Sequence, residues 1–333
     1  MMMFSCKSIL VTGGTGSFGK KFIRHILENY PEIDRIVVYS RDEFKQFEMG
    51  NMPFFKKYEE KLRFFIGDVR DKERMMRAFK KIDVVIHAAA LKQVPSCEYN
   101  PFEAVKTNIL GAQNVINCAI DAGVKRVVAL STDKACAPIN LYGATKLCSD
   151  KLFIAGNAYA GGSETRFSVV RYGNVAGSRG SVIPFFKHLI AEGAKELPIT
   201  DFRMTRFWLK LEQAVEMVMD ALGLMQGGEL FVRKIPSMRM TDLAESIAPG
   251  IKLREVGLRP GEKIHEQMIT VNDAPNTFDL GKFYVILPQM QFSGIKYDLN
   301  DAKPVTPDFE YHSGNNPWFL TIPEMQKMLE TLS

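Results

Sequence analysis

Short apolar runs alternate along the first half of the chain with segments whose apolar residues recur every three or four positions. The second kind predicts amphipathic helices, as at Phe18, Phe22 and Ile26, and longer helices are expected at 102–122 and 142–158. The apolar runs predict strands at 8–12, 35–39, 62–66, 84–90, 127–131 and 167–171. This alternation predicts an α/β fold with a Rossmann-type, doubly wound parallel sheet.

The alternation breaks near Asn174, and the later segments are of mixed character. A chain of 333 residues exceeds the usual size of a single domain, so a second lobe is expected. We therefore predict a nucleotide-binding domain at 1–174 and a smaller C-terminal α/β substrate-binding lobe at 175–333. The apolar segment at 228–232 leaves open a return of the chain to the main sheet.

Composition and charge argue against several classes of function. The formal net charge is +5, and basic residues are interspersed with acids, so no nucleic-acid partner is expected. The five cysteines form no Cys-x-x-Cys pair, which argues against a disulfide framework or a zinc site, and no metal is expected. No run approaches the roughly 18 apolar residues of a membrane helix. We expect a soluble cytoplasmic protein with reduced thiols and no membrane partner.

The first predicted strand runs directly into a glycine-rich turn. Gly13, Gly16 and Gly19 have the Gly-x-x-Gly-x-x-Gly spacing, and a predicted helix follows them. Such a turn lets the backbone approach a pyrophosphate and directs the amino terminus of a helix at it. An ordinary glycine turn is the alternative, but the flanking strand and helix favour a dinucleotide site.

The end of the second predicted strand bears on the choice of dinucleotide. NAD sites commonly carry an acid there for the ribose 2′-hydroxyl, whereas a 2′-phosphate favours a basic residue. Ser40 and Arg41 follow Tyr39 in this chain, which favours NADP, although Asp42 and Glu43 come next.

Tyr142 and Lys146 lie one turn apart on a predicted helix. A phenol titrates near 10, so it needs a nearby cation to act as a base at neutral pH, and Lys146 is placed to supply one. A lone pair at this spacing is usually a surface feature. Here the preceding strand ends in Thr132, Asp133 and Lys134, and ligands of open α/β sheets bind at the carboxyl ends of strands.

Other predicted strands also end in polar residues. Asp68 and Val69 follow the third strand and could hydrogen-bond an adenine edge, while Lys92 lies beyond the fourth. His87 falls inside the apolar fourth strand, so we interpret it as a core histidine rather than a catalyst.

A charged run near the end of the predicted substrate lobe is a further candidate. Arg259 and Lys263 could bind a diphosphate there, and Glu262 could accept ribose hydroxyls. The alternative is a charged surface turn without a ligand.

Together these motifs resemble those of the extended short-chain dehydrogenases that act on nucleotide sugars. The stretches that begin at Ser131 (Ser-Thr-Asp-Lys-Ala) and Asn140 (Asn-Leu-Tyr-Gly-Ala-Thr-Lys) are similar to those of the inverting UDP-N-acetylglucosamine 4,6-dehydratases of bacterial pseudaminic acid synthesis. Retaining 4,6-dehydratases typically carry Asp-Glu where this chain has Asp133 and Lys134, so the resemblance is to the inverting group. The chain departs from that group's pattern at Gln93, where the group usually has His.

The resemblance implies a lyase that binds UDP-N-acetylglucosamine and NADP, returns the hydride internally, and forms a homo-oligomer, either a dimer or a multiple such as a hexamer. The implied product is UDP-2-acetamido-2,6-dideoxy-β-L-arabino-hex-4-ulose, used for pseudaminic acid and for glycosylation of flagellin or the bacterial surface. Three alternatives stay open: a retaining 4,6-dehydratase, a UDP-sugar 4-epimerase, and a catalytically silent NADP-binding sensor.

Matching positions assign roles to individual residues. The resemblance implies that Tyr142 takes the proton of the 4-hydroxyl, with Thr132 bonded to the same oxygen. We expect Lys134 to take the C5 proton as a neutral amine, because Lys146 and the nicotinamide add positive charge nearby, and Asp133 to protonate the departing C6 hydroxyl. The sequence leaves open the alternative that Asp133 takes the C5 proton first. The implied dinucleotide contacts are Gly13, Thr15, Gly16, Ser17, Phe18, Gly19, Ser40, Arg41, Asp42, Glu43, Phe44, Lys45, Asp68, Val69, Ala88, Tyr142 and Lys146. The implied substrate contacts are Lys92, Asn174, Arg179, Gly180, Ser181, Val182, Thr200, Arg259 and Glu262.

Overall fold

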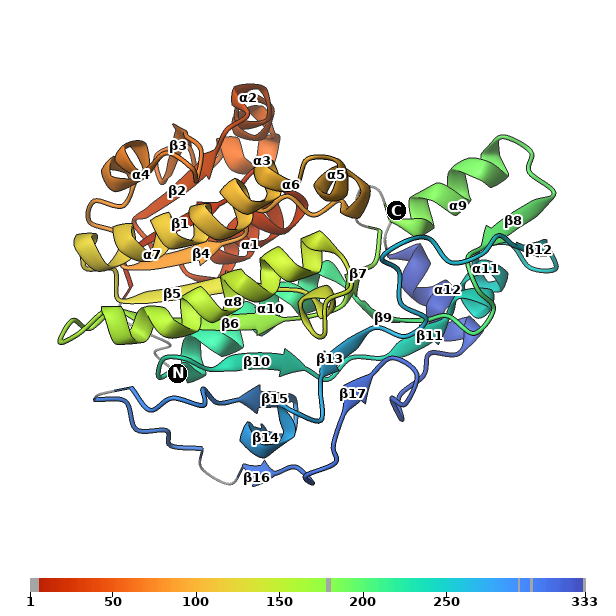
Figure 1. The fold of residues 1–333 in the computed structure, drawn as a ribbon. Coiled ribbons are helices and arrows are strands. Elements are labelled where there is room, and N and C mark those ends of the chain that lie inside the picture. The colour runs from red at the N-terminus through yellow and green to blue at the C-terminus, as the bar shows by residue number, and fades with distance from the viewer. Residues whose placement is uncertain (1–5, 178–180, 293, 300–301, 332–333) are drawn as a thin grey trace.

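The computed structural model describes residues 6–177, 181–292, 294–299 and 302–331. Within these residues the main sheet has ten strands in the order β16-β14-β15-β10-β6-β5-β4-β1-β2-β3 (Figure 1). The seven strands from β10 to β3 are parallel, and β15, β14 and β16 continue the sheet antiparallel, so the predicted α/β fold is confirmed. The strands are β1 (Ser8–Thr12), β2 (Arg35–Ser40), β3 (Leu62–Ile66), β4 (Val84–His87), β5 (Arg126–Leu130), β6 (Arg166–Arg171), β10 (Leu230–Arg233), β14 (Thr277–Asp279), β15 (Phe283–Ile286) and β16 (Lys303–Pro304).

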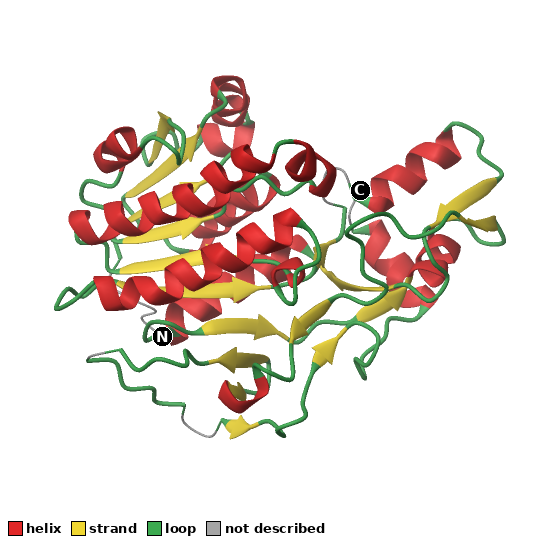
Figure 2. Ribbon diagram, in the orientation of Figure 1, coloured by secondary structure: helices red, strands yellow, loops and turns green. Residues whose placement is uncertain are grey.

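Helices cover both faces of this sheet (Figure 2). Successive residues of β1 point to opposite faces: Leu10 packs in the cluster that includes α4, α7 and α8, whereas Ile9 and Val11 pack with α1 and α10. Burial on both faces explains why these parallel strands are almost wholly apolar. The helices around the sheet are α1 (Ser17–Asn29), α2 (Glu43–Asn51), α3 (Pro53–Lys56), α4 (Lys72–Ala78), α5 (Val94–Tyr99), α6 (Pro101–Ala104), α7 (Gly111–Ala122), α8 (Leu141–Tyr159) and α10 (Leu211–Leu224).

Strand β4 is shorter than the apolar run that predicted it. The strand ends at His87, beyond which the backbone N–H of Ala88 lies 3.3 Å from the carbonyl and 3.1 Å from the hydroxyl of Thr12, and the N–H of Ala89 donates to the hydroxyl at 3.2 Å. His87 itself is 1% exposed, and its Nδ1 lies 2.9 Å from the same hydroxyl. The histidine therefore lies in the core, as interpreted from the sequence.

The helix predicted at 102–122 is interrupted. A π-helical turn at Val105–Leu110 separates α6 from α7. Within this turn the buried side chain of Asn108 bonds the backbone N–H and carbonyl of Leu91, at 2.8 and 2.9 Å, and donates to the Thr145 hydroxyl at 3.0 Å. The turn thus ties the loop after β4 to α8.

A second, smaller body lies beyond the carboxyl ends of the central strands (Figure 1). It contains the sheet β11-β9-β7, the pair β12-β8 and the helices α9, α11 and α12, while β13 pairs with β17. Its elements are β7 (Asn174–Val175), α9 (Val182–Ala191), β8 (Glu196–Ile199), β9 (Thr205–Leu209), β11 (Ser237–Arg239), α11 (Met240–Ile247), β12 (Lys252–Glu255), β13 (Gln267–Ile269), β17 (Tyr311–His312) and α12 (Ile322–Glu330).

The second half of the chain also returns to the main sheet. Strand β10 overlaps the segment 228–232 and pairs in parallel with β6, and β15, β14 and β16 extend the same edge. Residues after 174 therefore contribute to both bodies, and the boundary between 1–174 and 175–333 stays a prediction. Among the helices that the structure describes, none has the length and apolarity needed to cross a membrane.

Candidate active site

The glycine turn between β1 and α1 is closely packed. Gly13 has a φ of +65°, and a Cβ there would lie 3.0–3.1 Å from the backbone of Ala88 and Ala89. A Cβ on Gly19 would lie 2.5 Å from the carbonyl oxygen of Gly14. Among the described residues no side chain caps the start of α1, whose first turn also carries no acid, so its N–H groups are free to bind an anion. These features fit the pyrophosphate of a dinucleotide.

At the end of β2 the carboxylate of Asp42 is engaged, whereas the side chain of Arg41 is largely exposed. The carboxylate of Asp42 accepts the backbone N–H of Lys45 at 2.9 Å and pairs with its Nζ at 2.7 Å, so it serves as the cap of α2. The hydrogen bond to the Lys45 side chain lowers the pKa of Asp42. Arg41 is 53% exposed on its side chain, and its guanidinium lies 3.6 Å from Asp68. The hydroxyls of Ser40 and Thr15 lie 3.0 Å apart beside it.

Asp68 is placed at the end of β3 as predicted, but its carboxylate has a partner. Arg70 donates to one carboxylate oxygen from Nε at 2.9 Å and from a terminal nitrogen at 2.7 Å. Burial opposes ionisation, yet the hydrogen bonds from Arg70 lower the pKa of Asp68 overall. Tyr39 donates to the backbone carbonyl of Asp68 at 2.9 Å, and Val69 is 4% exposed. The remaining predicted dinucleotide residues lie at the start of α1 and α2: Ser17, Phe18, Glu43 and Phe44.

Thr132, Asp133 and Lys134 follow β5 and meet residues from the second body. Thr132 donates to Oδ1 of Asp133 at 2.9 Å, and Nζ of Lys134 lies 3.1 Å from the same oxygen. Nζ also lies 3.2 Å from Oε1 of Glu266 and 3.4 Å from Oδ1 of Asn174, which opens β7. Oδ2 of Asp133 is buried without a hydrogen-bond partner among the described residues. The sequence motif thus forms one cluster with a carboxylate that the sequence did not point to.

The nearest charged neighbours of Lys134 are carboxylates. Burial by itself would lower the pKa of Lys134, but the attraction of Asp133 and Glu266 outweighs it and raises the pKa. Burial raises the pKa of Asp133, as expected for a carboxyl that carries a proton. The neutral amine expected for Lys134 beside Lys146 and the nicotinamide stays a prediction.

Tyr142 and Lys146 are both buried near the start of α8, with 9% and 3% of their surface exposed. Burial raises the pKa of Tyr142 to about 12, while the charge of Lys134 and a hydrogen bond with Thr132 act in the opposite direction. Burial lowers the pKa of Lys146, against the attraction of Asp150. Lys134 thus also acts on the phenol, and the support of the phenolate by Lys146 stays a prediction.

A buried network fixes α8 against the ends of the strands. Ser131 donates to Oδ2 of Asp150 at 2.6 Å, and a terminal nitrogen of Arg171 lies 3.4 Å from the same oxygen. Arg171 also donates to the backbone carbonyl of Met268 at 2.8 Å. Asp150 could have been found from the sequence, because it lies four residues after Lys146 and residues at this spacing share a helix face.

The charged run at 259–263 docks on the loop after Lys134. Asn140 donates from Nδ2 to the carbonyl of Gly261 at 2.8 Å, and Lys263 donates from Nζ to the carbonyl of Cys136 at 2.6 Å. Lys263 is thus engaged with the backbone, whereas Arg259 is 65% exposed and lies 3.8 Å from Glu262. This run is a contact between the two bodies and more than a solvated turn.

The other predicted substrate residues are dispersed around this junction. Lys92 is exposed in the loop after β4, and Thr200 follows β8 in the second body. Ser181 precedes α9 and Val182 begins it, with Oγ of Ser181 buried and lacking a partner among the described residues. Arg179 and Gly180 lie outside the described residues.

Residues 9–288 match the model of a family described as polysaccharide biosynthesis protein. The chain belongs to this family. A relative from Campylobacter jejuni subsp. jejuni serotype O:2, a UDP-N-acetylglucosamine 4,6-dehydratase (inverting), is 53% identical, and the match covers 98% of each chain. A relative from Rickettsia akari, a UDP-glucose 4-epimerase, is 40% identical over 99% of this chain and 97% of its own. The first relative confirms the resemblance to inverting dehydratases stated from the motifs.

Solved structures agree with this family assignment. Pen from Bacillus thuringiensis is 38% identical, with a TM-score of 0.88 and coverage of 99% of both chains. DesIV from Streptomyces venezuelae, a dTDP-glucose 4,6-dehydratase with NAD and TYD bound, is 25% identical, with a TM-score of 0.66 over 77% of this chain and 86% of its own. Together with the glycine turn, the NAD bound in DesIV supports a nicotinamide dinucleotide as the cofactor of this family member.

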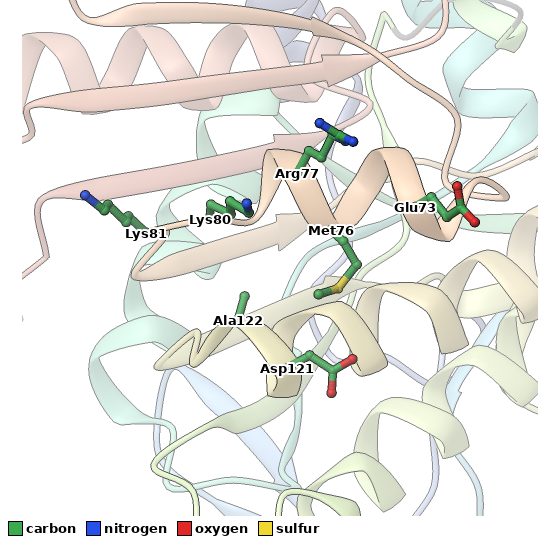
Figure 3. Close-up of a pocket in the computed structure, with 7 residues that line it drawn as sticks. All are labelled: Glu73, Met76, Arg77, Lys80, Lys81, Asp121 and Ala122. Carbon is green, nitrogen blue, oxygen red and sulfur yellow. The ribbon is translucent and has the colours of Figure 1, made fainter.

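A surface pocket between α4 and α7 lies away from the site. Figure 3 shows its lining, with Met76 of α4 pointing toward Ala122 of α7. Lys81 precedes β4 and Ala122 precedes β5, so the pocket lies toward the amino ends of these strands. Ligands of open α/β sheets bind at the opposite, carboxyl ends, where Lys134 lies.

Proposed function

We propose that this chain is a UDP-N-acetylglucosamine 4,6-dehydratase that inverts C5 and gives UDP-2-acetamido-2,6-dideoxy-β-L-arabino-hex-4-ulose. The observation that carries the proposal is the cluster of Asp133 and Lys134 beside Tyr142 at the end of β5. A phenol, a carboxyl and an amine in one place supply the three proton transfers that a dehydration needs. The 53% identical relative named for the same reaction supports it.

Each residue of the cluster has a separate role in the proposed reaction. The glycine turn would hold the dinucleotide, and its nicotinamide would supply the transfer of hydride between C4 and C6. Tyr142 takes the proton of the 4-hydroxyl, with Thr132 bonded to the same oxygen. Lys134 first releases its ammonium proton to water and then takes the C5 proton, and Asp133, whose pKa burial raises, gives a proton to the departing C6 hydroxyl, which leaves as water.

We also propose NADP as the dinucleotide. Arg41 is exposed at the end of β2, and Asp42, the acid that could have bound a 2′-hydroxyl, is occupied as the cap of α2. A guanidinium binds a phosphate through charge-assisted and often bidentate hydrogen bonds. Denaturing the purified protein and identifying the released dinucleotide tests this proposal, and recovery of NAD alone would contradict it.

A UDP-sugar 4-epimerase is the second candidate, because a relative 40% identical over nearly the whole chain carries that name. A catalytically silent NADP-binding sensor is the third. Mass spectrometry after incubation with UDP-N-acetylglucosamine separates them: the dehydratase product has lost one water, an epimer has the same mass with altered stereochemistry, and a sensor leaves the sugar unchanged.

In deuterated water the dehydratase should place deuterium at C5 with inverted configuration, read from proton couplings. A first product with the D-xylo configuration would point to a retaining enzyme.

The reaction would supply pseudaminic acid for glycosylation of flagellin or the bacterial surface, and the enzyme is expected to be a homo-oligomer. Helices α7 and α8 pack side by side, and apolar side chains near their ends are at least half exposed, namely Leu110 and Tyr159 at 50% and 60%. Pairing of these helices with those of a second copy would cover such residues. Light scattering that found only a species of 37.6 kDa would contradict an oligomer.

A further inference from the structure

Glu266 reaches the catalytic cluster from the second body. It immediately precedes β13, and its side chain is 4% exposed. Oε1 lies 3.2 Å from Nζ of Lys134 and 3.7 Å from Nε of Arg206, which belongs to β9. The backbone N–H of Glu266 donates to the hydroxyl of Ser313 at 2.9 Å, which fixes the segment that carries it. The carboxylate is therefore held between the catalytic lysine and an arginine.

Every element packed around Lys134 contributes a polar or charged group. Asp133 of the same turn lies 3.1 Å from Nζ, Asn174 of β7 lies 3.4 Å from it, and Tyr142 of α8 and Arg206 of β9 act on it electrostatically. Glu266 adds the second carboxylate. Two carboxylates thus face one ammonium, and they cannot both be ionised beside each other without raising the pKa of one of them.

We propose that Glu266 is a positioning residue that sets where the protons of the Asp133–Lys134 pair reside. Its ionised carboxylate keeps Lys134 protonated in the free protein and keeps the proton of Asp133 in place for the C6 hydroxyl. This inference rests on the proposed function, in which Lys134 and Asp133 act at C5 and C6.

The electrostatics of the carboxyls agree with this geometry. Burial opposes ionisation of Glu266, but the charges of Lys134, Arg206 and Lys263 lower its pKa, so it is the ionised carboxylate of the cluster. For Asp133, burial raises the pKa most and Glu266 raises it further, against the attraction of Lys134. The surroundings thus favour the ionised form of Glu266 and shift Asp133 toward its protonated form.

Chemical labelling of the purified protein with its bound dinucleotide tests the proposal without turnover. Acetic anhydride acylates neutral amines, so the labelling rate of Lys134 at fixed pH reports its deprotonated fraction, with exposed Lys57 as internal reference. Removing an opposite charge at this distance lowers a lysine pKa by about 1–3 units, so Glu266→Gln should speed the labelling of Lys134 by about 10- to 1000-fold. Glu266→Asp keeps the charge and should label less than about tenfold faster than the wild type.

The pH profile of turnover gives a second readout. Loss of the Glu266 charge lowers the pKa of Lys134, so the limb of the profile that follows Lys134 deprotonation should move to lower pH by about 1–3 units in Glu266→Gln. Glu310→Gln is the matched control, since Glu310 accepts from Gln267, the residue next to Glu266, at 3.3 Å but is not part of the cluster.

Three results would overturn the proposal: unchanged labelling of Lys134 in Glu266→Gln, slower labelling in that variant, or an equal rise in Glu310→Gln. If Glu266→Gln does not fold, the pH dependence of labelling in the wild type decides, because the pKa of Lys134 must then lie above the ordinary lysine value of about 10.4, and a lower value would overturn the proposal. Failure of the dehydratase proposal would show separately, in the mass of the sugar product.

Discussion

The two halves of the site are held by different means. The dinucleotide half lies on a parallel sheet whose strands are buried on both faces. The groups that would contact the dinucleotide there belong mainly to the backbone of the glycine turn. The sugar half is assembled across two bodies by a few polar contacts: Asn140 with Gly261, Lys263 with the carbonyl of Cys136, and Lys134 with Glu266. The first half is thus held by packing, whereas the second depends on polar side chains, among them those for which we propose a role in the chemistry.

This difference has a functional consequence. A dinucleotide that is kept through the reaction benefits from a rigid cradle, whereas a sugar must enter and leave. A junction made of hydrogen bonds and ion pairs can open at lower cost than a packed core, because each such contact contributes only about 0.5–3 kcal/mol. Substitutions in the two halves should therefore separate binding of the dinucleotide from turnover of the sugar.

The largest separation is expected at Lys134. Lys134→Ala should lower turnover by about 10²–10⁴-fold, typical of a lost general acid–base group, while the amount of bound dinucleotide stays unchanged. Lys134→Arg keeps the cation but cannot be a neutral base, so it should lose activity as well. Lys151→Ala, an exposed lysine on the same helix α8, is the control. Near-normal turnover of Lys134→Ala would remove this residue from the mechanism.

The sequence predicts the local motifs of the site better than the contacts between the two bodies. The glycine turn, the end of β2 and the Thr132–Lys134 motif are local in sequence, and the structure places them where the alternation of strands and helices predicts. Glu266 and Arg206 escaped prediction because only tertiary packing brings β9 and the segment before β13 to Lys134. The effect of Glu266 on the charge of Lys134 escaped prediction for the same reason, since the two residues are 132 positions apart in the sequence.

The buried His87 allows the dinucleotide half, which lies on the main sheet, to be tested through the pH dependence of its stability. Burial lowers the pKa of His87 to about 3, well below its value of about 6.5 in the unfolded chain. The folded state therefore binds fewer protons, so its stability is complete above pH 6.5 and falls as the pH drops from about 6.5 toward 3, by up to roughly 4 kcal/mol. Urea unfolding followed between pH 7 and 4 measures this slope.

His87→Asn should flatten that slope, because it removes the titrating ring while keeping a polar group near Thr12. The exposed His188, whose side chain is 67% accessible, gives the matched control His188→Asn, which should leave the slope as it is. An equal slope in the wild type and His87→Asn would mean that other groups govern the acid sensitivity of the sheet.

A smaller effect is expected at Arg41, in the same half. Arg41→Ala should weaken NADP binding by about 1.5–3 kcal/mol, or roughly 10- to 150-fold, and leave NAD binding nearly unchanged, because only NADP carries the 2′-phosphate. Calorimetric titration of protein stripped of its dinucleotide measures both affinities. Arg254→Ala removes an exposed arginine of the second body that pairs with Glu196, and should change neither. An equal loss of affinity for both dinucleotides would show that Arg41 does not recognise the 2′-phosphate.

The smallest effect should come from Asn140, whose side chain serves both halves. Its Oδ1 caps α8 by accepting the N–H of Gly143 at 2.8 Å, and its Nδ2 donates to the carbonyl of Gly261 across the junction. Asn140→Ala removes both contacts and should lower the free energy of unfolding by about 1 kcal/mol, the usual value of a helix cap.

Asn140→Asp keeps the cap but loses the donor, so its unfolding free energy should stay close to that of the wild type while the Michaelis constant for the sugar nucleotide rises. Thr321→Ala, which removes the cap of α12 far from the junction, should show the opposite pattern, with a lower unfolding free energy and an unchanged Michaelis constant. If Asn140→Asp leaves the Michaelis constant unchanged, the contact with Gly261 does not govern how the sugar half is held, and the contrast between the two halves must rest on Lys263 and Glu266 alone.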